Sequence, residues 1–178
     1  MSLVVVCALI SGCSSHSAPT PIATQPSSEI SNGLAAPIAC ERLAAWIDPP
    51  SGWIARPVEA DFQHVHQFWV SPSGRTAYGV ILMKLPLPTG PDWTLWAFLQ
   101  RMRQTEGRAD LIEKRKDAAL PGYRFVADGS RYRIRVNFIV RDWRAWAIYA
   151  GTLRSETIAD AELELAEAAR ENTRVIPP

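Results

Sequence analysis

The chain has 178 residues and a net charge of +1 at pH 7, with 47% of its residues hydrophobic and 21% charged. This length suits one domain of ordinary size with shorter segments outside it. The near-neutral charge argues against a dedicated nucleic-acid binder, which carries a strongly basic surface.

The chain begins with a short apolar stretch that ends at a cysteine. Residues 3–10 are almost entirely apolar, but a membrane-spanning helix needs about 20 such residues. The stretch is instead typical of a secretory signal. The run Ile10-Ser11-Gly12-Cys13 resembles the lipobox of bacterial lipoproteins, in which an apolar residue and two small residues precede the modified cysteine.

The lipobox resemblance implies that residues 1–12 are a lipoprotein signal peptide and that Cys13 carries acyl chains. More than one acyl chain would anchor the protein firmly in a membrane. The alternative is an ordinary secretory signal in which Cys13 has no role. By resemblance to enteric lipoproteins, Ser14 after the cysteine implies a lipid-anchored cell-envelope protein on the outer membrane, facing the periplasm.

Residues 13–39 are expected to form the lipidated cysteine followed by a disordered tether. This segment is rich in Ser, Pro, Thr and Ala, and Glu29 is its only charged residue. Such a composition buries too little apolar surface to offset the entropy lost on ordering. A flexible tether of this length would hold the folded part about 25–30 Å from the lipid.

Residues 40–178 are expected to form a single α+β domain. Cys40 would be the one cysteine left in it, and we expect it to be buried rather than catalytic. Its first strands are predicted over residues 52–57, 63–70 and 78–85, the last two joined by a Pro- and Gly-containing turn. A helix is predicted over residues 93–105, since apolar residues recur on one of its faces, with Gly107 as its stop. These apolar residues are Leu95, Phe98, Leu99 and Met102.

The second half of the domain is predicted as antiparallel strands and a final helix. The strands cover residues 111–117, 123–128, 131–141 and 143–152, and the first of them is polar enough for a sheet edge. A two-residue turn at Arg141 and Asp142 would pair Phe138 with Ala145. The final helix is predicted from an N-cap at Ser155 to about Asn172. Its apolar stripe is expected to be Ile158, Ala161, Leu165 and Ala168.

Two segments carry a family resemblance. They are Asp48-Pro49-Pro50-Ser51-Gly52-Trp53, which leads into a strand, and residues 143–152, which lead into the last helix. The order of elements over residues 46–175 resembles PsbP-like domains, which include the extrinsic oxygen-evolving protein of photosystem II, a Ran-binding nuclear import factor and small bacterial lipoproteins. The resemblance implies a PsbP-like sandwich, an antiparallel sheet with helices packed on one or both faces. It also implies a binding or assembly module without chemistry of its own, and it transfers no site residue.

Five arginines and one tryptophan are expected to share the outer face of the sheet. They are Arg124, Arg131, Arg133, Arg135, Arg144 and Trp146. Such a surface could dock a protein or an anionic envelope component, because Arg and Trp are frequent at interface hot spots. The alternative is a solvated face on which the arginine stems cover apolar surface.

Two further groups of side chains are candidate sites. His64 and His66 share one face of a strand, and such a pair begins some zinc sites. The chain offers no evident third ligand, so no metal or cofactor is expected. A pocket for an apolar ligand or lipid could be lined by Trp93, Trp96 and Phe98 together with Trp46, Trp53 and Trp69, although packing in the core is the alternative.

The sequence therefore predicts a membrane-anchored, non-catalytic binding or assembly module. The alternative is a carrier of a small apolar ligand or lipid. A pocket larger than about 300 Å³ would favour the carrier, and a filled core with an exposed Arg and Trp face would favour the docking module.

Overall fold

The computed structural model describes residues 33–117, 121–154 and 160–176. The strands are β1 (Ile38–Cys40), β2 (Ala45–Ile47), β3 (Ile54–Ala55), β4 (Glu59–Ala60), β5 (His64–Val70), β6 (Thr76–Lys84), β7 (Asp110–Lys116), β8 (Gly122–Asp128), β9 (Tyr132–Arg141), β10 (Arg144–Leu153) and β11 (Arg174–Val175). The helices are η1 (Glu41–Leu43), α1 (Pro91–Glu106) and α2 (Asp160–Asn172). The predicted signal peptide, Cys13, most of the tether and the N-cap at Ser155 lie outside the described residues.

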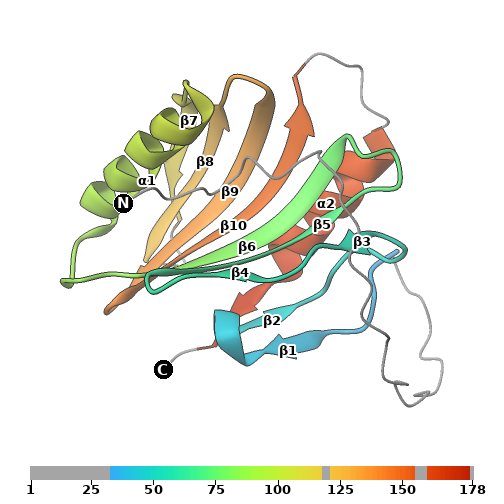
Figure 1. Ribbon diagram of the computed structural model, residues 1–178, viewed down its shortest axis with the longest axis horizontal. Helices are drawn as coiled ribbons and strands as arrows, with labels where there is room; N and C mark the ends of the chain where they lie inside the picture. The colour runs from blue at the N-terminus through green and yellow to red at the C-terminus, as the bar shows by residue number, and fades with distance from the viewer. Residues whose placement is uncertain (1–32, 118–120, 155–159, 177–178) are drawn as a thin grey trace.

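Within the described residues, the strands form a large sheet of eight strands and a small sheet of three. The large sheet has the order β3-β5-β6-β10-β9-β8-β7, with β4 also paired to β5, and the small sheet has the order β1-β2-β11. All the paired strands are antiparallel. Helix α1 lies on one face of the large sheet, and α2 and the small sheet lie on the other (Figure 1). We call these the α1 face and the α2 face.

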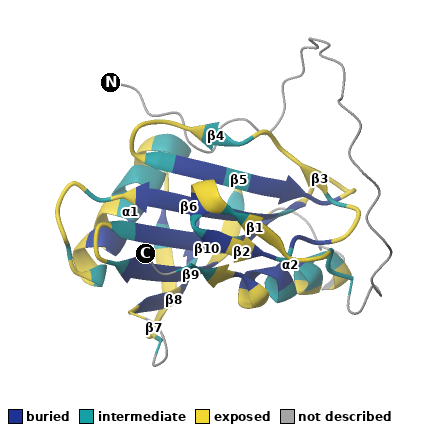
Figure 2. Cartoon of the chain, turned by 90° about the horizontal axis from the view of Figure 1, so that it is seen from below, coloured by how far each residue is buried: buried dark blue, intermediate teal, exposed yellow. Residues whose placement is uncertain are grey.

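Each face of the large sheet has its own apolar core. On β6, Tyr78 and Val80 pack on the α2 face, while Ile81 and Met83 pack on the α1 face. Successive side chains of a strand point to opposite faces, so a central strand buried on both sides reads as a continuous apolar run. Figure 2 shows this as buried central strands flanked by exposed edge strands.

The predicted hairpins, the first helix and the polar edge strand are confirmed. Helix α1 buries Leu95 and Leu99, and it ends at Gly107, whose φ of 73° is the left-handed conformation that glycine favours. Strand β7 lies at the edge of the large sheet. The predicted strand over residues 52–57 is shorter than expected, since β3 has only two residues.

The register predicted for the β9–β10 hairpin is wrong by two residues. The turn consists of Asp142 and Trp143, so Phe138 pairs with Ala147 rather than with Ala145. Asp142 has a φ of 51°, a left-handed conformation that Asp tolerates better than most residues. A shift of two residues keeps every side chain on its predicted face.

Two further expectations are corrected. The folded part begins before Cys40, because Leu34 packs against the α2-face core and β1 starts at Ile38. On α2 the buried alanines are Ala166 and Ala169, while Ala161 is exposed, so the helix is rotated from its predicted stripe. No helix among the described residues is long and apolar enough to cross a membrane.

Candidate functional site

A cavity of about 520 Å³ lies between α1 and the α1 face of the large sheet. The sheet contributes side chains from β5, β6, β9 and β10, and α1 contributes the opposite wall. Most of the lining is apolar. It includes Phe68, Val70, Ile81, Met83, Phe98 and Ile134.

The cavity forms because the closest contacts of α1 are with β7, β8 and β9, at one edge of the large sheet. At its start, Asp92 accepts a 2.6 Å hydrogen bond from Lys114 Nζ on β7. In its middle, the Phe98 ring lies 6.1 Å from the Phe125 ring and 5.6 Å from the Phe138 ring, on β8 and β9. The helix therefore covers β8 and β9 closely and leaves space over β10, β6 and β5 (Figure 1).

A buried histidine and a tyrosine form the polar centre of the cavity wall. His66 is 4% exposed, stacks on Phe68 at 4.9 Å, and its Nε2 lies 2.8 Å from Tyr149 Oη. Burial lowers the pKa of His66 to about 4, so the imidazole is neutral at pH 7. Burial raises the pKa of Tyr149 above its ordinary value, so its hydroxyl stays protonated.

The other nitrogen of His66 has no hydrogen-bond partner among the described residues. Nδ1 is buried, and Glu59 Oε2 lies 3.9 Å away, which is too far for a hydrogen bond. The negative charge of Glu59 favours the tautomer with the proton on Nδ1, in which Tyr149 donates its hydroxyl proton to Nε2. Buried polar atoms without partners are uncommon in folded proteins, and they mark places where a ligand or water can bind.

Glycine at position 79 makes this arrangement possible. Gly79 lies on β6 opposite Tyr149, and a Cβ placed there would come within 2.6 Å of the Tyr149 ring. The tyrosine ring therefore crosses β6 over a residue without a side chain and reaches His66 on β5. Glycine inside a strand often marks such a close approach.

The histidine pair does not form a metal site in the described part of the chain. His64 and His66 both line the cavity, as their shared face predicts. His64 Nδ1 lies 3.1 Å from Asp61 Oδ1. No group of three or more His, Cys, Asp or Glu side chains among the described residues could hold a metal ion.

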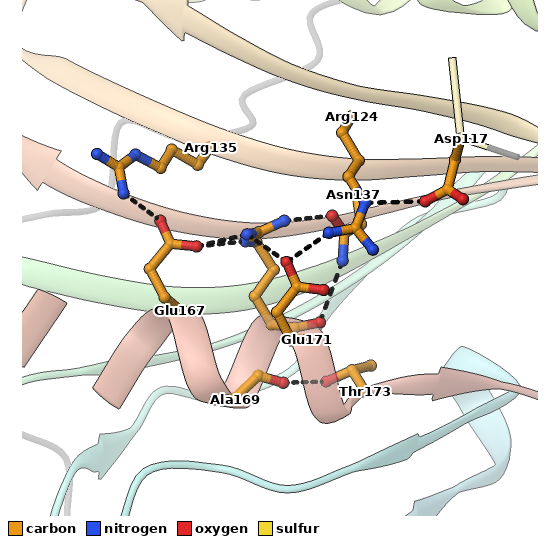
Figure 3. A network of polar contacts seen from close by, with 9 residues as sticks. Asp117, Arg124, Arg135, Asn137, Glu167, Ala169, Glu171 and Thr173 are labelled. Carbon is orange, nitrogen blue, oxygen red and sulfur yellow. Dashed lines mark hydrogen bonds and ion pairs between the residues drawn. The ribbon is translucent and has the colours of Figure 1, made fainter. Parts of the chain in front are cut away.

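Three of the predicted surface arginines contact the acidic residues of their own domain. Arg124 donates to Asp117 and Glu171 at 2.8 Å each, and Arg135 donates to Glu167 at 3.0 Å (Figure 3). Arg133 donates to both carboxylate oxygens of the buried Asp128, at 2.7 and 3.0 Å. This pair holds the pKa of Asp128 below its ordinary value.

Helix α2 supplies carboxylates to two of these arginines, Arg124 and Arg135. Its own Arg170, 8% exposed, donates to Glu167, Glu171 and the Asn137 side chain on β9. Together with Arg115, these arginines line a groove of about 440 Å³ between β7 and β9. Helix α2 therefore borders the expected open face and binds Arg124 and Arg135, while Arg124, Arg133 and Arg135 each stay about half exposed.

The other predicted members of that surface lie elsewhere. Trp146 is fully buried in the α2-face core, where its Nε1 donates a 2.8 Å hydrogen bond to the carbonyl oxygen of Leu43. Its assignment to an exposed docking face was wrong, because α2 and the small sheet cover that side of β10. Arg131 precedes β9 and Arg144 begins β10, and neither lines the groove.

Of the tryptophans considered for a pocket, Trp69 packs in the α2-face core as expected, whereas Trp46, Trp93 and Trp96 do not. Trp46, Trp93, Trp96 and Trp143 are each about half exposed, and Trp93 stacks on Trp96 at 4.6 Å. Of the four, Trp96 lines the cavity.

Comparison with known proteins supports the architecture. No protein-family model and no curated protein matches the sequence. The solution structure of cyanobacterial PsbP (CyanoP) from Synechocystis sp. PCC 6803 matches with a TM-score of 0.60, covering 85% of this chain and 98% of that chain at 12% sequence identity. This chain has a PsbP-like fold. The similarity confirms the predicted α+β class, and at this identity it describes the PsbP-like fold alone.

Sequence reasoning found part of the site in this PsbP-like domain. The shared face of His64 and His66 was read from strand alternation. Tyr149 and Arg101, which also line the cavity, were not singled out. The strand glycine Gly79 was the one local signal of a close approach.

Proposed function

We propose that the protein is a lipid-anchored, non-catalytic binding module of the cell envelope that carries a small, largely apolar ligand. The observation that carries the proposal is the cavity under α1. Its volume of about 520 Å³ exceeds the roughly 300 Å³ at which small-molecule sites begin. An apolar lining with a few convergent polar groups is the usual composition of such a site.

The membrane anchor is supported by the sequence pattern that ends at Cys13. Exposed aromatic residues add to it, because Phe62, Trp93 and Trp143 lie in or next to turns at the end of the sheet where β6 leads into α1. Figure 1 shows the β4–β5, β6–α1 and β9–β10 connections together at that end. Exposed Trp and Phe side chains suit a membrane–water interface.

The carrier function is tested with a neutral apolar dye and one cavity-filling variant. The full chain carrying Cys13→Ser has no acyl chain that could compete for the cavity. N-Phenyl-1-naphthylamine should bind it with a saturable rise in fluorescence. Ala77→Phe places a ring in the cavity from β6 and should weaken binding about tenfold or more.

The matched control adds the same atoms outside the cavity. Ala55 is exposed on β3 and does not line the cavity, so Ala55→Phe should leave dye binding unchanged. Equal affinities of Ala77→Phe, Ala55→Phe and the parent chain would reject the carrier function, as would the absence of saturable binding.

Docking through the arginine row is the second candidate, and the groove lined by Arg124, Arg133 and Arg135 is the observation that favours it. It has less support, because each of these arginines already binds a carboxylate of the domain. Reversing the charge of Arg133 and Arg135 would set glutamates against Asp128 and Glu167. We therefore expect that double variant to lose stability, so a loss of partner capture in it would not identify a docking surface.

A further inference from the structure

The cavity wall holds a partly buried guanidinium, and two of its nitrogens have no hydrogen-bond partner among the described residues. Arg101 on α1 lines the cavity, and its Nε and Nη2 atoms are buried with no hydrogen-bond partner in the described ranges. Asp61 is the carboxylate that acts on this charge. Its Oδ1 already accepts hydrogen bonds from the backbone N–H groups of Gln63 and His64, both at 2.7 Å.

An unpaired guanidinium in this position is costly. Arginine stays protonated at all ordinary pH values, and the two buried nitrogens of Arg101 lose their hydration without gaining a hydrogen bond. The arginines on the α2 face show the contrast, since Arg133 binds Asp128 and Arg135 binds Glu167. An anion bound in the cavity would supply the hydrogen-bond acceptors that these two nitrogens lack.

A second unused donor lies in the same wall. With Tyr149 donating to Nε2, the buried Nδ1–H of His66 has no acceptor. An acceptor atom of a ligand in the cavity would satisfy it. A neutral imidazole donor also carries no charge that would have to be removed from water when the ligand binds.

A carboxyl group in the same wall restricts where an anionic group can lie. Glu106, the last residue of α1, also lines the cavity, with Oε1 buried and without a hydrogen-bond partner among the described residues. Burial raises the pKa of the Glu106 carboxyl group. A carboxyl group that can ionise nevertheless repels a second negative group placed beside it. The acidic end of a ligand is therefore best placed at Arg101, with apolar atoms along the remaining wall.

We propose that the ligand is a single-tailed anion whose carboxylate or phosphate head pairs with Arg101, with its chain against the apolar side chains of β5, β6 and β9. This inference rests on the proposed carrier function, because it names the chemistry of that same ligand. Both head groups match the forked donors of a guanidinium, which bind carboxylate and phosphate oxygens in pairs.

The test measures displacement of N-phenyl-1-naphthylamine from the full chain carrying Cys13→Ser. The three competitors are decanoate, decyl phosphate and decanol, which share one tail. At least one of the two anions should displace the dye at about a tenfold lower concentration than decanol, as expected for one charge-assisted pair. A preference for decanoate indicates a free acid, and a preference for decyl phosphate indicates a phosphate-headed lipid.

Two variants separate the cavity charge from general attraction to a basic protein. Arg101→Met should weaken the preferred anion about tenfold and leave decanol within about twofold. Arg103→Met removes the same charge from the same helix outside the cavity and should change neither. Thermal melting of both variants with and without decanol shows whether each remains folded.

The outcomes separate this inference from the proposed function. If decanol competes as well as both anions and Arg101→Met alters none of the three, the anion is wrong and the carrier function stands. If the dye does not bind the parent chain at all, the carrier function fails and this inference fails with it.

Discussion

Stability should fall between pH 7 and pH 5 because of one buried histidine. His66 has a pKa of about 4 in the folded protein, against an ordinary value of 6.5, and burial is the cause. Between these values the unfolded chain binds a proton that the folded protein does not. The stabilisation is therefore complete above pH 6.5 and is lost as the pH falls towards 4.

The size of this effect follows from the two pKa values. The shift of the His66 pKa from 6.5 to about 4 corresponds to about 3 kcal/mol in the free energy of unfolding. About 2 kcal/mol of this is lost between pH 7 and pH 5. Urea unfolding of the full chain carrying Cys13→Ser at the two pH values measures it. In His66→Gln the imidazole is absent, and its amide can still meet the Tyr149 hydroxyl, so the pH dependence should shrink by about that amount.

His64→Gln is the matched control, since it removes the neighbouring imidazole on the same face of β5 and keeps His66 in place. This control should retain the pH dependence that His66 causes. If His66→Gln and the parent chain lose the same stability between pH 7 and pH 5, the burial argument for His66 is wrong.

Three further outcomes are expected. Trp146→Phe should lower the free energy of unfolding by about 3 kcal/mol, through a smaller buried side chain and an unsatisfied Leu43 carbonyl group; a loss below 1 kcal/mol in urea unfolding would contradict its place in the core. Glu167→Gln should lower the free energy of unfolding by about 2 kcal/mol, because a neutral amide replaces the carboxylate that binds Arg135 and Arg170. The control Glu164→Gln, at an exposed position of the same helix, should lower it by less than about 0.5 kcal/mol. Mass spectrometry of the natural product should find acyl chains on an N-terminal Cys13, and a free thiol there, or peptides from residues 1–12, would refute the anchor.

The parts of the fold that follow from local pattern were predictable. Alternation along residues 131–141 predicted β9, and the Pro- and Gly-containing turn predicted the β5–β6 hairpin. The small sheet was missed, since its strands are short and its closing pair joins Trp46 to Arg174 across most of the domain. No local pattern indicates a pairing between residues so far apart in the chain.

The candidate site shows the same division between local and long-range information. Strand alternation placed His64 and His66 on one face, and it also placed the arginines of β9 on the opposite face. The position of α2 decided whether those arginines faced solvent, and that position depends on Ala166 and Ala169 packing on the sheet. Likewise, the cavity depends on which strands α1 packs against. The apolar face of the helix shows that it packs on a sheet, but it does not specify those strands.

A crystal structure with ω-bromodecanoate would show whether the cavity beneath α1 binds the ligand. We expect an anomalous bromine peak inside the cavity, near Phe68, Ile81 or Ile134, with the carboxylate beside Arg101. A bromine peak confined to the exposed Trp93 ring, or a cavity without ligand density at saturating concentration, would contradict it.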